Sequence, residues 1–154
     1  MAGKKVLAAG KFDILHLGHI AYLEQAKDLV GKDGELVVVI ARDDTIERER
    51  GTPPVFPQEQ RRRLVEALSI VDSAVLGYDS ENHSDIVVDQ KPDYIALGYD
   101  QYTNIEDLEE TFRKKNMTTE IVRLEKSTAD GLYSSTLIRE RILKHYLENG
   151  RPKK

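Results

Sequence analysis

Two histidines and two glycines lie close together near the start of the chain. The apolar run Val6–Ala9 ends at Gly10, and a helical pattern begins at about Gly18 after a short polar loop. His16 and His19 are three residues apart, so they share one face of the first helical turn. Free backbone N–H groups at this end of a helix attract anions, and a glycine lets a ligand approach the backbone closely. The stretch therefore predicts a phosphate site.

Two other interpretations of the histidine pair stay open from its spacing. The pair could bind a metal, although the chain has no Cys and no third ligand is near in the sequence. The two side chains could also be ordinary polar surface, which the flanking glycines and the apolar run before them disfavour. The loop is not one of the common phosphate-binding loops, because neither Gly-Lys-Ser/Thr nor Gly-x-Gly-x-x-Gly is present in it.

The composition limits the kind of protein. A length of 154 residues fits one domain, and 32% charged with 40% hydrophobic residues is typical of a soluble globular chain. A net charge of −4 argues against a general nucleic-acid binder, and the absence of Cys excludes thiol catalysis. There is no apolar run of 18 residues and no signal-peptide pattern. We expect a single domain over residues 1–154 that stays in the cytoplasm and binds neither nucleic acid nor membrane.

Apolar runs alternate with helical patterns along the whole chain. This alternation predicts an α/β fold, a Rossmann-like doubly wound sheet of about five parallel strands with helices on both faces. The predicted strands are Lys5–Ala9, Leu36–Ala41, Ser73–Gly77, Tyr94–Leu97 and Glu120–Leu124. The predicted helices are Ile20–Val30, Pro57–Leu68, Asp85–Gln90, Ile105–Lys115 and Ser135–Leu147.

Polar segments follow four of the predicted strands. In a doubly wound sheet, ligands bind outside the carboxyl ends of the strands, where the strand order reverses. We therefore expect these segments to meet in one crevice. They are residues 11–19, 42–44, 98–101 and 126–136.

Arg61 lies on the apolar stripe of its predicted helix, with Leu64, Val65 and Leu68 on the buried face. A buried cation needs an anionic partner. That partner could be a carboxylate such as Asp72 or Asp43, or it could be a triphosphate. Arg62 and Glu66 are four residues apart and are expected to form a surface pair.

The segment Arg42–Pro54 combines charges, a glycine and paired prolines. This composition predicts a mobile loop. Such a loop could close over a substrate through Arg48 or Arg50, or it could be a solvated charged loop.

The decapeptide from Gly10 to His19, Gly-Lys-Phe-Asp-Ile-Leu-His-Leu-Gly-His, resembles the signature of the cytidylyltransferase-like nucleotidyltransferases. The resemblance implies that the two histidines contact a nucleoside triphosphate and stabilise phosphoryl charge during attack on the α-phosphorus. Arg61 matches an arginine of the family's Glu-x-Arg helix, which favours the phosphate as its partner. The turn Tyr133–Arg139 resembles the family's Ile-Ser-Thr-Thr turn, whose hydroxyls and amides hold the triphosphate.

Two further segments are similar to archaeal-type FAD synthases. These are Ala-Arg-Asp-Asp-Thr at residues 41–45 and Gly-Tyr-Asp-Gln at residues 98–101, with Tyr99 where Pro is usual. The resemblance implies adenylyl transfer from ATP to FMN, which gives FAD and pyrophosphate. Cytidylyl transfer from CTP to glycerol 3-phosphate, or to another small phosphorylated alcohol, is the alternative, although those enzymes have Gly-Asp-Asp-Trp in the second segment. A nucleotide-binding module without catalysis is the third possibility.

The resemblance also implies roles for individual residues. Asp13 is expected to stabilise the loop as a hydrogen-bond acceptor rather than act as a base, and Lys126 to supply the charge of a family arginine that has no counterpart here. The expected catalytic residues are His16, His19, Lys11 and Arg61. The expected nucleotide-binding residues are Gly10, Lys11, Phe12, His16, Gly18, His19, Asp100, Ser134, Ser135 and Thr136. The expected substrate or ribose contacts are Arg42, Asp43, Tyr99 and Gln101. The candidates for stacking on a flavin are Tyr78, Tyr99, Tyr102 and Tyr133.

The resemblance finally implies a cofactor and an assembly. Mg²⁺, or another divalent metal, would bridge phosphate oxygens with few ligands from the protein. A homodimer is compatible with the family, although no residue of this chain points to one.

Overall fold

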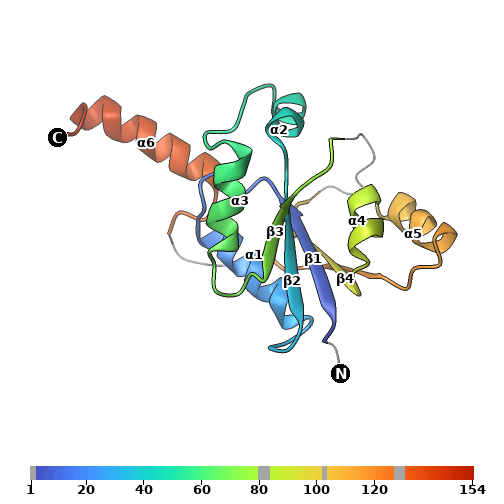
Figure 1. Ribbon diagram of the computed structural model, residues 1–154. Coiled ribbons are helices and arrows are strands. Elements are labelled where there is room, and N and C mark those ends of the chain that lie inside the picture. Colours follow the sequence, from blue (N-terminus) through green and yellow to red (C-terminus); the bar gives the residue numbers. More distant parts are fainter. Residues whose placement is uncertain (1–2, 80–83, 102–103, 127–130) are drawn as a thin grey trace.

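Five parallel strands form one sheet in the order β3-β2-β1-β4-β5 (Figure 1). The computed structural model describes residues 3–79, 84–101, 104–126 and 131–154. The strand bounds are Lys5–Gly10 for β1, Glu35–Ile40 for β2, Ser73–Leu76 for β3, Tyr94–Leu97 for β4 and Glu120–Arg123 for β5. All five predicted strands are confirmed to within one residue at each end. The strand order reverses between β1 and β4, as the crossover from β3 to β4 requires.

Helices connect the strands and cover both faces of the sheet. Their bounds are Leu17–Asp28 for α1, Asp43–Arg50 for α2, Gln58–Glu66 for α3, Ser84–Gln90 for α4, Ile105–Lys114 for α5 and Ser135–Asn149 for α6. The five predicted helices are confirmed, with α1 starting three residues before the predicted Ile20. In the part of the chain that the structure describes, no helix is long and apolar enough to span a lipid bilayer.

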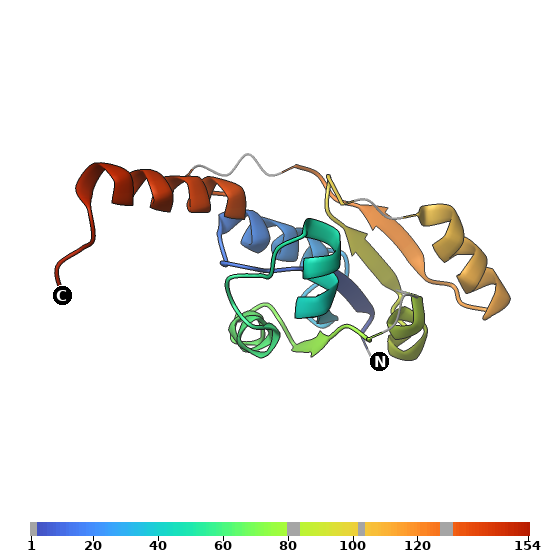
Figure 2. The ribbon, with the colours of Figure 1, turned by 90° about the horizontal axis from the view of Figure 1, so that it is seen from above.

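Alternate side chains of the strands enter two separate cores. On β1, Val6 and Ala8 pack in the core under α1 and α3, whereas Leu7 packs in the core under α4 and α5. Figure 1 shows these helix pairs on opposite sides of the sheet, and Figure 2 shows the same layers from above. Near-continuous apolar strands such as β2 are suited to this arrangement, because both of their faces are covered. The doubly wound α/β fold predicted from the sequence is confirmed.

The helix α2 corrects the prediction of a mobile loop over Arg42–Pro54. Its ends are stabilised by charge, because Asp43 and Asp44 lie in the first turn and Arg48 and Arg50 in the last. Ile46 is fully buried and anchors the helix to the body. Gly51 then ends the helix in the left-handed conformation, with φ 78°. The sequence predicted a loop here because the helix has only one apolar residue, Ile46, and therefore shows no helical repeat of apolar residues.

One apolar prediction for a helix face was wrong, and a second helix has no buried face. Leu64 of α3 is exposed, so the buried face of that helix consists of Arg61 and Val65. The C-terminal helix α6 has no buried residue, and its apolar side chains Ile142 and Tyr146 are exposed. Figures 1 and 2 show α6 extending away from the body of the protein.

Candidate active site

A cavity of about 1200 Å³ opens at the carboxyl ends of β1, β2 and β4. It lies at the switch point between β1 and β4, where an open α/β sheet binds its ligands. The expected catalytic, nucleotide-binding and substrate-binding residues all line it except Arg61 and Asp43, and the further candidates Arg48 and Lys126 do not line it. Two predicted segments fall partly outside the described residues: Tyr102, a candidate for flavin stacking, and residues 127–130 of the loop before α6.

The two histidines cap the first turn of α1 as a reciprocal pair. Nδ1 of His16 accepts a hydrogen bond from the backbone N–H of His19 at 3.3 Å, and Nδ1 of His19 accepts one from the backbone N–H of His16, also at 3.3 Å. The imidazole rings stack with their centroids 3.7 Å apart. A Ser-x-x-Glu capping box satisfies the same two backbone donors. Here two imidazoles fill those roles, so both rings are held in place at the N-terminus of the helix.

This capping arrangement fixes the tautomer of each ring. An Nδ1 atom that accepts a hydrogen bond carries no proton, so in the neutral ring the proton is on Nε2. Burial lowers the pKa of His16, and burial together with the neighbouring His16 lowers the pKa of His19 to about 3. Both rings are therefore neutral at pH 7 without a ligand. Without a ligand, each ring therefore offers an Nε2–H donor rather than a positive charge to a phosphate.

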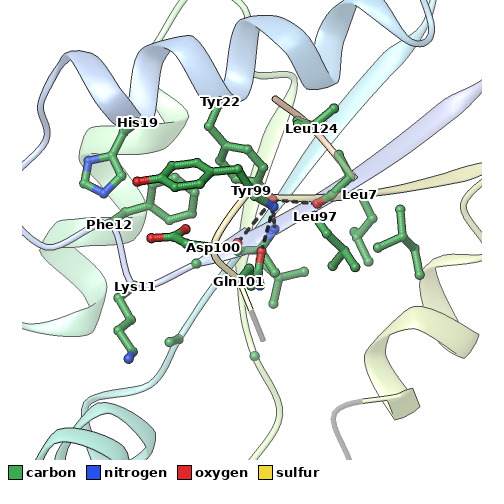
Figure 3. A pocket seen from close by; sticks show the side chains of 18 of the residues that line it. Leu7, Lys11, Phe12, His19, Tyr22, Leu97, Tyr99, Asp100, Gln101 and Leu124 are labelled. Carbon is green, nitrogen blue, oxygen red and sulfur yellow. Dashed lines mark hydrogen bonds between the residues drawn. The ribbon is translucent and has the colours of Figure 1, made fainter. Parts of the chain in front are cut away.

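The Phe12 ring packs against the ring of His19. It is buried, with its centroid 5.1 Å from that of His19 (Figure 3). The backbone of Phe12 has a φ of 50°, which turns the chain sharply after β1. A Cβ atom at Gly10 would lie 2.9 Å from the Phe12 ring. Gly10 therefore allows the aromatic ring to pack against the end of β1, which places His19 at the edge of the cavity.

The N-terminus of α6 meets the N-terminus of α1 across Gly18. A Cβ atom at Gly18 would lie 2.3 Å from the carbonyl oxygen of Tyr133. Ser134 is the N-cap of α6, since its hydroxyl accepts a hydrogen bond from the backbone N–H of Leu137 at 3.1 Å. One hydroxyl of the turn is therefore used as a helix cap. Ser135 and Thr136 line the cavity beside it, so two helix N-termini with free N–H groups face the same space.

The carboxylate of Asp13 connects the loop after β1 to two distant segments of the chain through hydrogen bonds. It is 2% exposed and accepts hydrogen bonds from the backbone N–H groups of Val55 and Phe56 at 2.8 and 3.0 Å. It also accepts a hydrogen bond from Arg139 of α6 at 2.7 Å. The prediction that Asp13 stabilises the loop is confirmed, because the segment Val55–Phe56 and the helix α6 both donate hydrogen bonds to this carboxylate.

Arg61 does not reach the cavity. Its side chain is 0% exposed, and its guanidinium donates to the carbonyl oxygens of Phe56, Lys11 and Ala41 at 2.7 to 2.9 Å. It donates a further hydrogen bond to the carboxylate of Asp43 at 2.7 Å. Of the two partners considered for Arg61, the structure supplies the carboxylate, and the preference for a triphosphate was wrong. The same contact explains why Asp43 does not line the cavity.

Unlike Arg61, three cationic side chains line the cavity: Lys11, Arg42 and Arg50. Arg42 donates through Nε to the carbonyl oxygen of Gly77 at 2.7 Å, which holds its guanidinium at the ends of β2 and β3. Lys11 forms an ion pair with Glu49 of α2 at 3.0 Å. Arg50 lies beside Glu49 on the same helix. Anionic groups of a ligand would therefore meet cations from the loop after β1, the end of β2 and the helix α2.

The segment after β4 forms a fixed turn at the centre of the cavity. The backbone N–H of Gln101 donates to the carbonyl oxygen of Gly98, and the side chain of Gln101 accepts from the backbone N–H of Gly98, both at 3.2 Å. Figure 3 shows Tyr99 and Asp100 extending from this turn into the cavity. Lys126, which was expected to replace a family arginine, lies over the Tyr99 ring with Nζ 5.6 Å from the ring centroid.

Sequence reasoning missed an apolar arm of the cavity. The arm lies between one face of the sheet and the helices α4 and α5, away from the histidines. It is lined by Leu7, Val39, Ile95 and Leu97 of the sheet, Ile86 and Val87 of α4, and Leu108 of α5. The pattern marked these residues only as core, because the space between a sheet and its covering helices depends on tertiary packing.

The described residues contain no group of three or more His, Cys, Asp or Glu side chains arranged to hold a metal ion. Both Nδ1 atoms of His16 and His19 accept hydrogen bonds from the backbone, so neither Nδ1 atom is free to bind a metal. Among the carboxylates that line the cavity are Glu49 and Asp100.

The chain matches the cytidylyltransferase-like family over residues 7–141. It belongs to this family. It is 44% identical to the FAD synthase of Methanopyrus kandleri, covering 92% of this chain and 93% of that protein. It is 46% identical to the FAD synthase of Ferroglobus placidus, covering 91% and 88% of the two chains.

A solved structure from Thermoplasma volcanium, described as a lipopolysaccharide core biosynthesis protein, is 43% identical. It aligns with a TM-score of 0.73 over 81% of this chain and 98% of that one. The resemblance noted from the decapeptide of residues 10–19 is thus confirmed over most of the chain, and the neighbouring structure has the same fold.

Proposed function

We propose that this chain is an FAD synthase: it transfers the adenylyl group of ATP to the phosphate of FMN and releases pyrophosphate. Two facts support the proposal. The chain belongs to a nucleotidyltransferase family, and its relatives at 41 to 46% identity are FAD synthases. The cavity also offers two contrasting environments, one lined by helix N-termini and cations and the other apolar.

The similarity to FAD synthases is the observation that carries the choice of acceptor, and the apolar arm of the cavity agrees with it. Leu7, Ile95 and Leu97 of the sheet and Ile86 and Leu108 of the helices line this part of the cavity, where they also form the edge of the core under α4 and α5. A flat tricyclic ring such as the isoalloxazine of FMN would gain free energy by leaving water for such walls. Glycerol 3-phosphate has no apolar surface of comparable size. The arm therefore favours FMN over the small phosphorylated alcohols that the sequence left as an alternative.

The polar end of the cavity suits the triphosphate of ATP. In the proposed reaction, Nε2–H of His16 and of His19 donates hydrogen bonds to the phosphate oxygens on which charge develops. The hydroxyls and free N–H groups at Ser135 and Thr136 hold the departing pyrophosphate from the N-terminus of α6. Neutral donors held by the backbone need no reorganisation during the reaction, which is how a preorganised site lowers a barrier.

The phosphate of the acceptor needs a positively charged binding site separate from that of the triphosphate. We assign this role to Arg42, because Gly77 fixes its Nε and the residue lines the cavity. Lys11, which precedes the histidines in the sequence, also lines the cavity and is the second candidate. An ionised phosphate attacks the α-phosphorus in line and needs little help from a general base, so positioning is the main task of the protein.

Mg²⁺ fits this site as an ion bound mainly to substrate. Mg²⁺ commonly takes one or two carboxylates together with phosphate oxygens and water, and Glu49 and Asp100 are carboxylates at the cavity wall. When bound, the ion would neutralise charge on the triphosphate.

The test compares two pairs of substrates. Purified protein with Mg²⁺ is incubated with ATP plus FMN, or with CTP plus glycerol 3-phosphate, and released pyrophosphate and FAD are measured. Pyrophosphate together with FAD in the first mixture supports the proposal. Release in the second mixture alone would replace it with cytidylyl transfer, and release with neither pair, nor with other phosphorylated acceptors, would favour a nucleotide-binding module without catalysis.

The proposal includes three expectations about the whole protein. One domain over residues 1–154 carries the activity, the protein acts in the cytoplasm, and it forms a homodimer. Light scattering during size-exclusion chromatography tests the last of these, since the dimer has twice the 17.5 kDa mass of the chain.

A further inference from the structure

We propose that Tyr99 is the platform on which the flavin ring of the acceptor stacks, and so a residue that determines acceptor specificity. This inference rests on the proposed function and names one contact within it. Tyr99 is 49% exposed, although its ring lines the cavity and lies at its centre (Figure 3). An aromatic ring left half-open to solvent inside a ligand cavity has unused surface that a ligand can cover.

The backbone around Tyr99 is held rigidly. Besides the hydrogen bonds between Gly98 and Gln101, Nη1 of Arg123 donates to the carbonyl oxygen of Gly98 at 3.0 Å and to that of Gln101 at 2.6 Å. Both ends of the turn are therefore fixed to β5. A ring on a fixed turn loses little conformational freedom when a ligand stacks on it, and such preorganisation favours affinity.

The ammonium group of Lys126 lies over the Tyr99 ring. Nζ of Lys126 lies 5.6 Å from the ring centroid, within the range of a cation–π contact. This contact uses one face of the ring and restrains its orientation. Tyr99 can then offer its other face to a planar ligand.

The position of the ring selects the flavin over the adenine. Tyr99 follows Leu97 by two residues, and the side chain of Leu97 is part of the apolar arm. Figure 3 shows the Tyr99 ring extending from the side of Leu97 toward His19 and Phe12. A flavin whose phosphate is held at Arg42 shares one cavity with the open face of this ring. The adenine belongs to the other substrate, whose phosphates extend toward the N-terminus of α6.

Flavin fluorescence gives a direct readout, because electron transfer from a stacked phenol quenches the excited isoalloxazine. FMN is titrated with wild-type protein, Tyr99→Phe and Tyr99→Leu without ATP, and the affinity for the unreactive analogue α,β-methylene-ATP is measured separately. We expect Tyr99→Leu to weaken FMN binding about tenfold, as for the loss of one stacked ring, and to remove most of the quenching. Tyr99→Phe should keep FMN binding within about twofold, and neither variant should change the affinity for the ATP analogue.

Two control variants separate Tyr99 from Tyr146 and Tyr78. Tyr146→Leu removes a similarly exposed tyrosine from α6, outside the cavity, and should leave FMN quenching unchanged. Tyr78→Leu removes another tyrosine that lines the cavity. Quenching lost in Tyr78→Leu but retained in Tyr99→Leu would overturn the proposal in favour of Tyr78.

The remaining outcomes distinguish this inference from the proposed function. Weaker binding of the ATP analogue in Tyr99→Leu, with FMN binding unchanged, would place the ring under the adenine and overturn the inference. If the wild-type protein makes FAD and Tyr99→Leu binds and quenches FMN as the wild type does, the inference fails and the function stands. If the wild type neither binds FMN nor makes FAD, both fail.

Discussion

His16 and His19 each cap the other's backbone N–H through Nδ1, at 3.3 Å in both directions. The imidazoles are therefore part of the helix terminus as well as of the cavity wall. A residue that caps a helix cannot turn away without exposing a backbone donor. The geometry thus ties the direction of both Nε2–H groups to the stability of α1.

The first prediction concerns His16→Asn. Asparagine is a good N-cap, so this variant keeps the acceptor for the backbone N–H of His19 while removing the imidazole donor. We expect kcat to fall about 100-fold or more and KM for ATP to change about threefold or less, since the donor acts on charge that develops in the transition state. Steady-state kinetics with a thermal melt to confirm folding checks this. Equal losses in kcat and in ATP affinity would mean that His16 acts in ground-state binding.

The second prediction concerns stability at acid pH. The pKa of His19 is about 3 in the folded protein, below its ordinary value of 6.5, because the ring is buried beside His16. Between these two values the unfolded chain binds a proton that the folded chain does not. The stabilising effect is therefore complete above pH 6.5 and is lost as the pH falls toward 3, by at most about 2 kcal/mol at pH 5.

Urea unfolding of the wild type and of His19→Gln at pH 7 and pH 5 measures this effect. The wild type should lose more stability on acidification than His19→Gln, and His145→Gln, which changes an exposed histidine of α6, should behave like the wild type. The same loss of stability in all three proteins would show that His19 does not carry the dependence.

The third prediction separates a structural arginine from a substrate ligand. Arg61→Met leaves the carbonyl oxygens of Phe56, Lys11 and Ala41 without their buried donor. Removing one partner of a buried charged network costs about 3 to 5 kcal/mol, which lowers the Tm of a domain of this size by about 6 °C or more.

Arg62→Met is the matched control on the same helix. Arg62 pairs with Glu59 and Glu66 at the surface, and surface pairs contribute about 1 kcal/mol or less. At a temperature where both variants are folded, KM for ATP should be close to the wild-type value. A large rise in KM for Arg61→Met without a fall in Tm would restore the phosphate as the partner of Arg61.

Strong local patterns explain how much of the fold could be predicted. A near-continuous apolar strand such as Leu36–Ile40 can be recognised from sequence because burial on both faces needs no knowledge of its neighbours. The helix α2 was missed because a single buried residue, Ile46, fixes it, and one residue has no periodicity. Charge and glycine content then pointed to a loop.

The candidate site could be predicted where it is local and not where it depends on packing. The histidine pair and the turn at Ser134 are short-range features, so their position at the cavity followed from the fold. The partner of Arg61 could not be derived, because an inward cation accepts either a carboxylate or a ligand, and its spacing does not tell which. The apolar arm around Leu97 required the actual distance between the sheet and its helices.

The last prediction concerns Gly18→Ala, for which two physical effects have opposite signs. Gly18 lies within α1, where replacing glycine by alanine ordinarily stabilises a helix by about 1 kcal/mol. Here the new Cβ would lie 2.3 Å from the carbonyl oxygen of Tyr133 and 2.9 Å from Cε1 of His16. Because the first of these atoms is backbone, α6 must move at its N-terminus to make room.

We therefore expect Gly18→Ala to destabilise the protein by about 1 to 3 kcal/mol, as for other overpacked positions, despite its better helix propensity. Turnover should fall as well, since Ser135 and Thr136 move with the start of α6. Gly77→Ala is the control, because its Cβ would lie 3.5 Å from the nearest atom, an ordinary contact, and its Tm should change little. An increase in Tm for Gly18→Ala would mean that α1 and α6 do not approach each other this closely, and the shared anion site built from their two N-termini would then be wrong.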